Sequence, residues 1–167
     1  DLDPVCRQVI AELEGLHLAG GLKFTPQGDL RGDWDSDRIS QVLSNLVKNA
    51  IQHGAPSDPI TVVARDHGSE VLLLVHNSGP SIPPNVQATM FEPMVRHVGD
   101  DQKNTGLGLG LYIASHVVAA HGGTIEVAST DADGTTFTVH LPRRVAPTRA
   151  RAVAALDAPA TRLNGTT

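Results

Sequence analysis

The sequence is poor in aromatic residues, in cysteine and in excess positive charge. Aromatic residues make up 3% of the 167 residues, so a core must consist mainly of Val, Leu, Ile and Ala, with Trp34, Phe91 and Phe137 added to it. The single cysteine, Cys6, cannot form an internal disulfide bond, which fits a reducing compartment. The formal charge of −5 argues against a protein that coats nucleic acid, because such proteins carry a basic stripe.

The sequence also lacks an apolar run of the roughly 20 residues that a membrane-spanning helix needs. Its first segment, DLDPVCRQVIAEL, has neither the basic start nor the continuous apolar stretch of a signal peptide. We therefore expect a cytoplasmic location and no direct membrane contact, with any anchor of a parent protein lying outside this chain. The length fits one domain, 1–143, and the Ala-, Arg-, Thr- and Pro-rich composition of 144–167 predicts a disordered tail.

Hydrophobic spacing divides the first 143 residues into short helices and strands. We expect helices from Pro4 to near Gly15 and over 36–53, 86–90 and 107–120, and strands over 22–25, 30–34, 60–64, 71–75, 124–129 and 135–141. Asp3 is expected to cap the first helix, and the breaker-rich block NSGPSIPPN (77–85) predicts a loop. Because helices and strands do not alternate strictly, we expect a two-layer α/β sandwich, with helices on one face of a mixed, mostly antiparallel sheet.

A glycine cluster precedes the last expected helix, in TGLGLGLYIASHVVAAHGGTIEV (105–127). Gly106, Gly108 and Gly110 indicate an anion site, because glycine lets the backbone approach a phosphate and the first amides of a helix lack intrahelical partners. A hinge or a close contact between helix and sheet remains the structural alternative. The G-x-G-x-G spacing after a polar stretch excludes a dinucleotide fold, and the absence of a following Gly-Lys-Ser or Gly-Lys-Thr excludes a P-loop.

Two amides interrupt the apolar pattern of DSDRISQVLSNLVKNAIQH (35–53). Asn45 and Asn49 are four residues apart and therefore share one face of the expected helix. Amide side chains on an otherwise apolar helix cost stability unless they meet a partner. Either each caps a neighbouring loop, or both face a ligand.

Five blocks, in order, resemble the ATP-binding catalytic domain of sensor histidine kinases, part of the GHKL ATPase superfamily with its Bergerat fold. They are NLVKNAIQH (45–53), VHNSGPSIPP (75–84), FEP (91–93), TGLGLGLYI (105–113) and the hairpin Gly134-Thr135. The resemblance extends from about Asp1 to Arg143. Asn77 followed by G-P-x-I-P is similar to the phytochrome-like branch of these kinases.

The resemblance implies ATP and Mg²⁺ as cofactors. It makes Asn49 the Mg²⁺ ligand, which suits a neutral amide because Mg²⁺ keeps several waters and binds the phosphates as well. It makes Asn45 a phosphate- or water-positioning residue where hydrolytic relatives carry a glutamate general base. An amide cannot take a proton, so the site should leave the γ-phosphate for another nucleophile. Arg96 is implied as a γ-phosphate contact, with His97 and Lys103 as further candidates; Lys103 fits an exposed lid residue equally well.

The implied catalytic residues are thus Asn45 and Arg96, and the implied metal ligand is Asn49. The implied nucleotide-binding residues are Asn45, Asn49, His53, Asn77, Gly79, Ile82, Gly106, Leu107, Gly108, Leu109, Gly110 and Thr135. The glycine cluster would bring amides to the phosphates and hinge a lid over 95–105. For Thr135, a contact near the phosphates and a role in holding the hairpin have equal weight.

Two positions depart from the family pattern. Asn77 stands where an aspartate usually reads the adenine amino group; its side-chain oxygen can still accept that hydrogen bond, at a loss on the order of 1 kcal/mol. Gln52 stands where a Lys or Arg often contacts the phosphates, and Lys48 points to another face of the helix. We therefore expect adenine preference to survive and ATP affinity to fall.

No histidine in the sequence has the context of a phosphoacceptor, so the chain should follow directly on a missing helical hairpin, with Asp1-Leu2 as its exit. We expect the chain to act as the catalytic fragment of a histidine protein kinase that cannot phosphorylate itself. The implied partners are its own dimerisation and phosphoacceptor domain, a response regulator and a second copy in the full-length protein; nucleic acid is not expected. An anti-sigma-type serine kinase and a non-catalytic nucleotide-binding regulator of the same fold are the alternatives.

Overall fold

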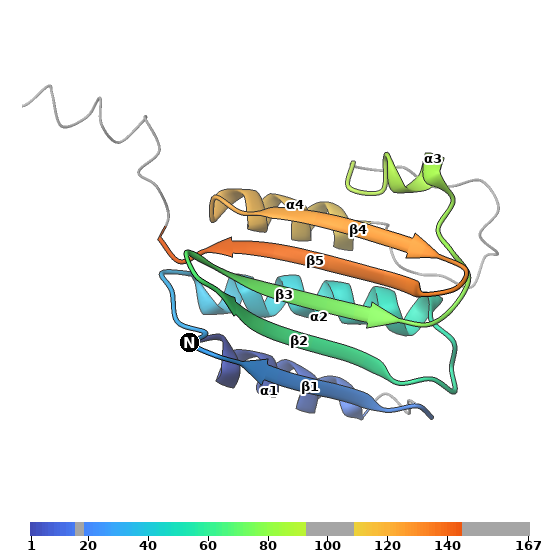
Figure 1. Cartoon of the computed structure of the whole chain (residues 1–167), viewed down its shortest axis with the longest axis horizontal. Helices are drawn as coiled ribbons and strands as arrows, with labels where there is room; N and C mark the ends of the chain where they lie inside the picture. Colours follow the sequence, from blue (N-terminus) through green and yellow to red (C-terminus); the bar gives the residue numbers. More distant parts are fainter. Residues whose placement is uncertain (16–18, 93–108, 145–167) are drawn as a thin grey trace, which may run out of the picture.

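The computed structural model describes residues 1–15, 19–92 and 109–144. Five strands form one sheet in the order β1-β2-β3-β5-β4 (Figure 1). Their bounds are β1 Leu22–Gln27, β2 Ile60–His67, β3 Glu70–Asn77, β4 Thr124–Thr130 and β5 Gly134–Pro142. The first two strands pair in parallel and the other neighbours pair antiparallel, so the expectation of a mixed, mostly antiparallel sheet is confirmed.

Three helices cover one face of this sheet, and all three lie behind it in Figure 1. They are α1 (Leu2–Glu14), α2 (Ser36–His53) and α4 (Gly110–Ala120), while α3 (Pro84–Gln87) is a single turn beside the β4 edge of the sheet. The two-layer sandwich with helices on one face is therefore confirmed. None of the helices in the described ranges has the length and hydropathy needed to cross a membrane.

The core lies between α2 and the inner face of the sheet. Helical spacing places six apolar residues of α2 on one stripe, each at most 1% exposed: Ile39, Val42, Leu43, Leu46, Val47 and Ala50. Alternate residues of β3 and β5, among them Val75 and Phe137, meet this stripe and are fully buried. The long helix predicted over 36–53 has the observed bounds, and Asp35 is its N-cap, accepting from the backbone N–H of Asp37 and Arg38.

Several local expectations were wrong. Residues 30–34 form no strand: Arg31 N–H bonds to the side chain of Asp29, and the indole of Trp34 donates to the carbonyl of Pro142 at 2.8 Å, so side-chain bonds hold this segment in place of strand pairing. Trp34 is accordingly half-buried and lies at the margin of the core. Asp1, not Asp3, caps α1, because the Asp1 carboxylate accepts from the N–H of Asp3 at 3.0 Å.

Other boundaries shift by a few residues. The short helix expected over 86–90 starts earlier, with Pro84 in the first helical position, where its missing N–H costs nothing. Asn77 is the last residue of β3 and not the start of the loop. The last helix begins at Gly110; positions 107 and 108, and the tail from 145 onward, lie outside the described residues.

Candidate functional site

The inner face of the sheet ends in a row of polar side chains. Thr135 on β5 is the direct cross-strand partner of Asn77 on β3 and of Ser129 on β4. We call these three residues the polar row. The row before it is apolar and contains the fully buried Phe137. Asn77 and Thr135 are each 4% exposed, and they are the buried polar residues of the described ranges. Since burying polar groups costs free energy unless they are hydrogen-bonded, this row is a candidate recognition element.

Asn77 lies beneath the C-terminal end of α2. A side chain added at Gly54, just after that helix, would come within 3.2 Å of the Asn77 Cβ. The Asn77 amide nitrogen donates to the carbonyl of Ser78 at 3.1 Å, and the same carbonyl accepts from the N–H of Ala55 at 2.8 Å. Within the described ranges, no hydrogen bond reaches the Asn77 amide oxygen. That oxygen is an acceptor available to a ligand.

Two glycines with positive φ allow backbone segments to meet here. Gly79 has φ of 142°, and a side chain at this position would come within 2.9 Å of the His53 carbonyl oxygen, so the loop after β3 passes directly over the end of α2. Gly134 has φ of 73°, and a side chain there would collide with the carbonyl of Asn77. Both contacts fix the ends of α2, β3 and β5 against one another.

A set of hydroxyl groups ties the loop after β3 to the hairpin between β4 and β5. The Ile82 N–H donates to Ser129 Oγ at 2.9 Å, and Ser129 Oγ lies 2.7 Å from Thr135 Oγ1. Ser81 donates to Asp131 through its hydroxyl at 2.5 Å and through its backbone at 3.2 Å. These bonds, the hydroxyl first, hold the pKa of Asp131 below its ordinary value. Sequence reasoning missed Ser129, although a serine at an inner position of TIEVAST was the signal.

The asparagines of α2 lie further along the same helix. Asn45 Nδ2 is buried, and it has no hydrogen-bond partner among the described residues. A side chain at Gly110 would be 3.6 Å from the Asn45 amide oxygen, so the start of α4 lies against Asn45. Helical rise separates Asn45 from His53 by roughly 12 Å along the axis, and Asn49 lies between them, half-buried.

The N-terminus of α4 has no side-chain cap within the described ranges. Leu109 is in the N-cap position and its side chain cannot accept a hydrogen bond, although its carbonyl accepts from the N–H of Ile113 at 2.8 Å. The first amides of a helix lack intrahelical acceptors and lie at the positive end of its dipole. Together with the unpartnered Asn45 Nδ2, they give this end of the site donors without acceptors.

The structure thus brings together most of the described residues predicted from the sequence. These residues lie along α2 and on the adjoining ends of β3, β5 and α4: Asn45, Asn49, His53, Asn77, Gly79, Ile82, Leu109, Gly110 and Thr135. His53 and Gln52 are exposed in the last turn of α2, and Lys48 is exposed as expected. The other predicted residues lie outside the described ranges: Arg96, His97, Lys103, Gly106, Leu107 and Gly108.

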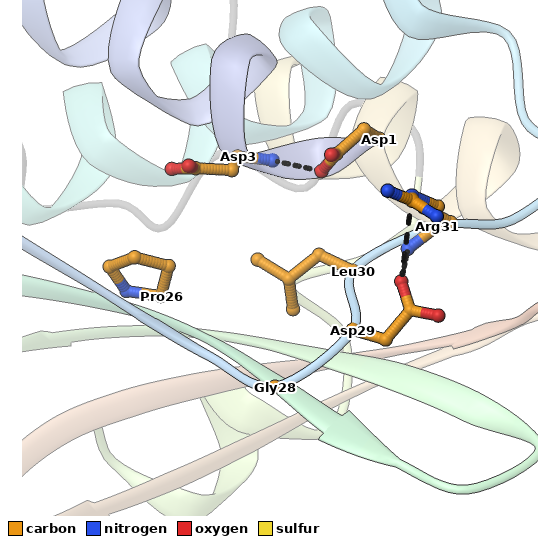
Figure 2. A pocket seen from close by; sticks show the side chains of 7 residues that line it. All are labelled: Asp1, Asp3, Pro26, Gly28, Asp29, Leu30 and Arg31. Carbon is orange, nitrogen blue, oxygen red and sulfur yellow. Dashed lines mark hydrogen bonds and ion pairs between the residues drawn. The ribbon is translucent and has the colours of Figure 1, made fainter.

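Two hollows lie at the opposite end of the sheet. Figure 2 shows the first, of about 440 Å³, between the start of α1 and the loop after β1. Asp1, Asp3 and Asp29 line it, so its charge opposes a polyphosphate. The second, of about 510 Å³, is lined in part by Arg143, whose guanidinium is already bonded to Asp66 and to backbone carbonyls. Within the described ranges no three His, Cys, Asp or Glu side chains form a metal cluster.

Comparison with known proteins places this geometry in context. A family model described as histidine kinase-, DNA gyrase B-, and HSP90-like ATPase matches residues 34–145. A bacteriophytochrome of Pseudomonas aeruginosa is 36% identical over 149 residues, which are 89% of this chain and 20% of that protein. The chain thus spans about a fifth of the length of this curated relative. The NSGPSIPP block predicted a likeness to the phytochrome-like branch of these kinases, and the bacteriophytochrome is a relative of that kind.

Solved structures show the same fold. The catalytic domain of histidine kinase ThkA superimposes with a TM-score of 0.74 at 30% identity, covering 86% of this chain and 93% of that one. A structure of ThkA in complex with response regulator protein TrrA superimposes with a TM-score of 0.71 at 29% identity, covering 86% of this chain and 40% of that one.

Proposed function

Because the chain belongs to the histidine kinase-, DNA gyrase B- and HSP90-like ATPase family and has the fold of histidine kinase catalytic domains, we propose that it binds ATP at the site built around α2 and presents the γ-phosphate to a histidine outside this chain. The proposed whole activity is that of a two-component sensor histidine kinase. Its substrate and partners belong to this proposal.

One observation carries the assignment. Two groups of polar atoms lie at different points along α2: the unpaired Asn45 Nδ2 with the uncapped start of α4, and the polar row, where no hydrogen bond of the described residues reaches the Asn77 oxygen. The first group offers donors, which suit phosphate oxygens, and the second offers acceptor and hydroxyl groups, which suit a base. The roughly 12 Å from Asn45 to the end of α2 is the length scale of an extended nucleoside triphosphate.

The side chains suit phosphoryl transfer better than hydrolysis. Asn45 is an amide and cannot take a proton from water, so it orients phosphate oxygens without acting as a general base. Catalysis by such a domain consists of positioning and charge neutralisation. Arg96 is proposed as the cation at the γ-phosphate.

The donor set also suits magnesium. An amide oxygen is a hard ligand, and Mg²⁺ in nucleotide sites takes one or two protein oxygens together with phosphates and waters, so the lack of a carboxylate cluster in the described ranges is no obstacle. We assign Asn49 as its protein ligand. When bound, the ion would neutralise part of the triphosphate charge, while Asn45 and the α4 amides would orient the phosphates.

The proposed partners are a dimerising hairpin that carries the phosphoacceptor histidine and a response regulator that receives the phosphoryl group. The ThkA structure, in complex with its response regulator, supports the second partner by analogy. An anti-sigma-type serine kinase and a non-catalytic nucleotide-binding regulator share the fold and remain the competing functions.

Two measurements test the proposal. Calorimetry of the 167-residue chain with ATP should show binding that requires Mg²⁺ and releases little phosphate over hours. Fused to a phosphoacceptor hairpin, the chain should then form a phosphoryl linkage that is lost in acid and stable in base, as expected for phosphohistidine. A linkage stable in acid would support the serine kinase, and absence of ATP binding at millimolar concentration would support neither kinase.

A further inference from the structure

We infer that His121 is a positioning residue for the phosphate end of the site: its Nε2 accepts a hydrogen bond from the Asp35 N–H and fixes how far α4 lies along α2. The position of α4 in turn decides where its first amides lie relative to Asn45. This inference rests on the proposed function, since it places phosphates between Asn45 and the start of α4. None of the sequence motifs assigned a role to this histidine.

His121 uses its two ring nitrogens for two different elements. It is the C-cap residue of α4, and its Nδ1 lies 2.7 Å from the Val117 carbonyl oxygen, one turn back in the same helix. Its Nε2 accepts from the backbone N–H of Asp35 at 3.2 Å. Because a carbonyl oxygen only accepts and a backbone N–H only donates, a single neutral tautomer, with the proton on Nδ1, makes both bonds. Nδ1 thus closes its own helix, and Nε2 reaches another element.

That other element is the start of α2. Asp35 is the N-cap of α2, and its carboxylate accepts from the N–H groups of Asp37 and Arg38 at 3.1 Å each. The backbone N–H of Asp35 takes no part in these capping bonds, and His121 is its acceptor. His121 therefore holds the residue at which the helix of Asn45 and Asn49 begins.

α4 runs antiparallel along α2 and meets it at two marked points. The two helices contact each other and both lie behind the sheet (Figure 1). At the first point His121 bonds to Asp35. At the second, a side chain at Gly110 would be 3.6 Å from the Asn45 amide oxygen. Helical rise puts roughly 15 Å between these points on α2 and roughly 17 Å on α4, so the two spans match. The bond at one end therefore sets the separation of Asn45 and the α4 amides at the other.

Apolar packing does not set this position by itself. The buried residues of α4 are Ala114 and Val118, which are both fully buried and aliphatic. Apolar burial has no direction, so it opposes separation of the two helices more than sliding of one along the other. Among the described residues, the His121–Asp35 bond is the one hydrogen bond that joins α4 and its caps to α2 and its caps.

Two substitutions separate this bond from the bond within α4. In His121→Asn, the amide nitrogen can replace Nδ1 as the donor to Val117, and the side chain is too short to reach Asp35. In His121→Gln, the amide oxygen can replace Nε2 as the acceptor of the Asp35 N–H. A role confined to ending α4 predicts that Asn is tolerated better than Gln. The positioning role predicts the reverse.

His116 provides a matched control on the same helix. Its Nδ1 lies 3.1 Å from the carbonyl oxygen of Tyr112, which is the same one-turn bond, and within the described ranges no hydrogen bond joins it to another element. His116→Asn therefore changes a ring of the same kind without touching the contact between α4 and α2.

The first measurement needs no nucleotide and uses ¹H–¹⁵N NMR spectra of the 167-residue chain. His121→Asn should shift the signals of the Gly110 N–H and the Asn45 side-chain amide, although both lie a whole helix span away. His121→Gln should return them to the wild-type positions, and His116→Asn should leave the Asn45 signal in place. Unmoved Gly110 and Asn45 signals in a folded His121→Asn would overturn the inference and leave the proposed function standing.

The second measurement compares Mg-ATP, by calorimetry, with adenosine, by ligand-detected NMR, because adenosine lacks the phosphates. His121→Asn should weaken Mg-ATP about fivefold or more, the factor that corresponds to one net hydrogen bond, and should weaken adenosine less than about twofold. His121→Gln and His116→Asn should stay within about twofold of the wild type for both ligands. An equal loss for the two ligands would show a merely structural role and overturn the inference.

His121→Gln also tests the inference alone if His121→Asn does not fold. A loss of Mg-ATP affinity in His121→Gln, with adenosine affinity unchanged, would contradict the positioning role, because this variant keeps the acceptor for Asp35. Failure of the wild type to bind Mg-ATP would overturn the proposed function and the inference together.

Discussion

Gly134 provides a sharp test of how the fold holds the site, because the chain offers a matched control. Gly68 lies in the turn between β2 and β3, Gly134 is the first residue of β5 after the β4–β5 turn, and both have nearly the same positive φ, 70° and 73°. A side chain at Gly68 would meet open space, whereas one at Gly134 would collide with the carbonyl of Asn77 and approach the Ser78 Cα at 2.9 Å. Gly→Ala at the two positions therefore imposes the same backbone strain and differs in the collision alone.

The expected magnitudes follow from these two contributions. Left-handed backbone costs an L-residue about 1–2 kcal/mol, so Gly68→Ala should lower the free energy of unfolding by that amount. Gly134→Ala adds forced overpacking against backbone, about 1–3 kcal/mol more. Because the collision moves Asn77, it should also weaken ATP binding, whereas Gly68, at the far end of β3, should leave the affinity unchanged.

Urea denaturation followed by circular dichroism measures the first effect, and calorimetry with Mg-ATP measures the second. Linear extrapolation is adequate, because the comparison is between two single-site variants of one chain. Equal loss of stability in the two variants, or a larger loss for Gly68→Ala, would refute the contact between the β4–β5 hairpin and the end of β3 on which the site geometry depends.

Three further outcomes are expected. Asn45→Leu removes a buried amide nitrogen that has no partner among the described residues. The free energy of unfolding should therefore stay level or rise by up to about 1 kcal/mol, while ATP affinity should fall about tenfold or more. A large loss of stability on denaturation would show that the amide has an internal partner. Asn49→Ala should abolish Mg²⁺-dependent ATP binding with an unchanged far-UV spectrum, and unchanged affinity by calorimetry would refute its metal role. Glu70 accepts from His140 at 3.2 Å and from His67 at 3.1 Å, and these bonds, His140 first, lower its pKa from the ordinary 4.5. Because the pKa of Glu70 is lower in the folded chain, its stabilising effect is present above about pH 4.5 and is lost as the pH falls through the folded pKa. Glu70→Gln should therefore destabilise the fold near neutral pH and match the wild type in acid. A difference in melting temperature that does not change with pH would contradict this.

Local patterns in the sequence predicted the elements that depend on local physics. The 3.6-residue spacing of apolar residues in 36–53 requires only that one stripe be buried, and Asp35 beside it needs only free amides to cap. The segment 30–34 failed because what holds it is distant: Trp34 bonds to Pro142, more than a hundred residues away. Alternating residue types could not reveal a partner in another strand.

The polar row could not have been predicted for the same reason. Asn77 and Thr135 were identified through family resemblance, but their adjacency depends on the register of β3 with β5, and the place of Ser129 depends on the register of β4 with β5. A one-residue shift in either pairing would turn the side chains of one strand to the other face. The register of each strand pair is fixed by side chains over the whole inner face of the sheet, including Phe137. No single short stretch of the sequence contains all of these residues.

The two ends of the sheet differ in whether their side-chain N–H donors meet an acceptor, and this difference supports the proposed place of the nucleotide. At one end, Arg143 donates to the carbonyls of Gly68, Arg31 and Asp29 and to the carboxylate of Asp66, whose pKa is lowered first by that side-chain bond. Each nitrogen of that guanidinium already donates to at least one acceptor, so the second hollow, which Arg143 lines, offers an anion little to bind.

At the other end, the Asn77 amide oxygen and the Asn45 Nδ2 have no partners among the described residues, and the Asn45 nitrogen is buried. Leaving a buried donor such as Asn45 Nδ2 unpaired costs free energy. A ligand that satisfies both groups at once, with phosphate oxygens at Asn45 and the adenine amino group at Asn77, recovers that cost on binding. Asn45→Leu is therefore the variant in which stability and affinity should move in opposite directions.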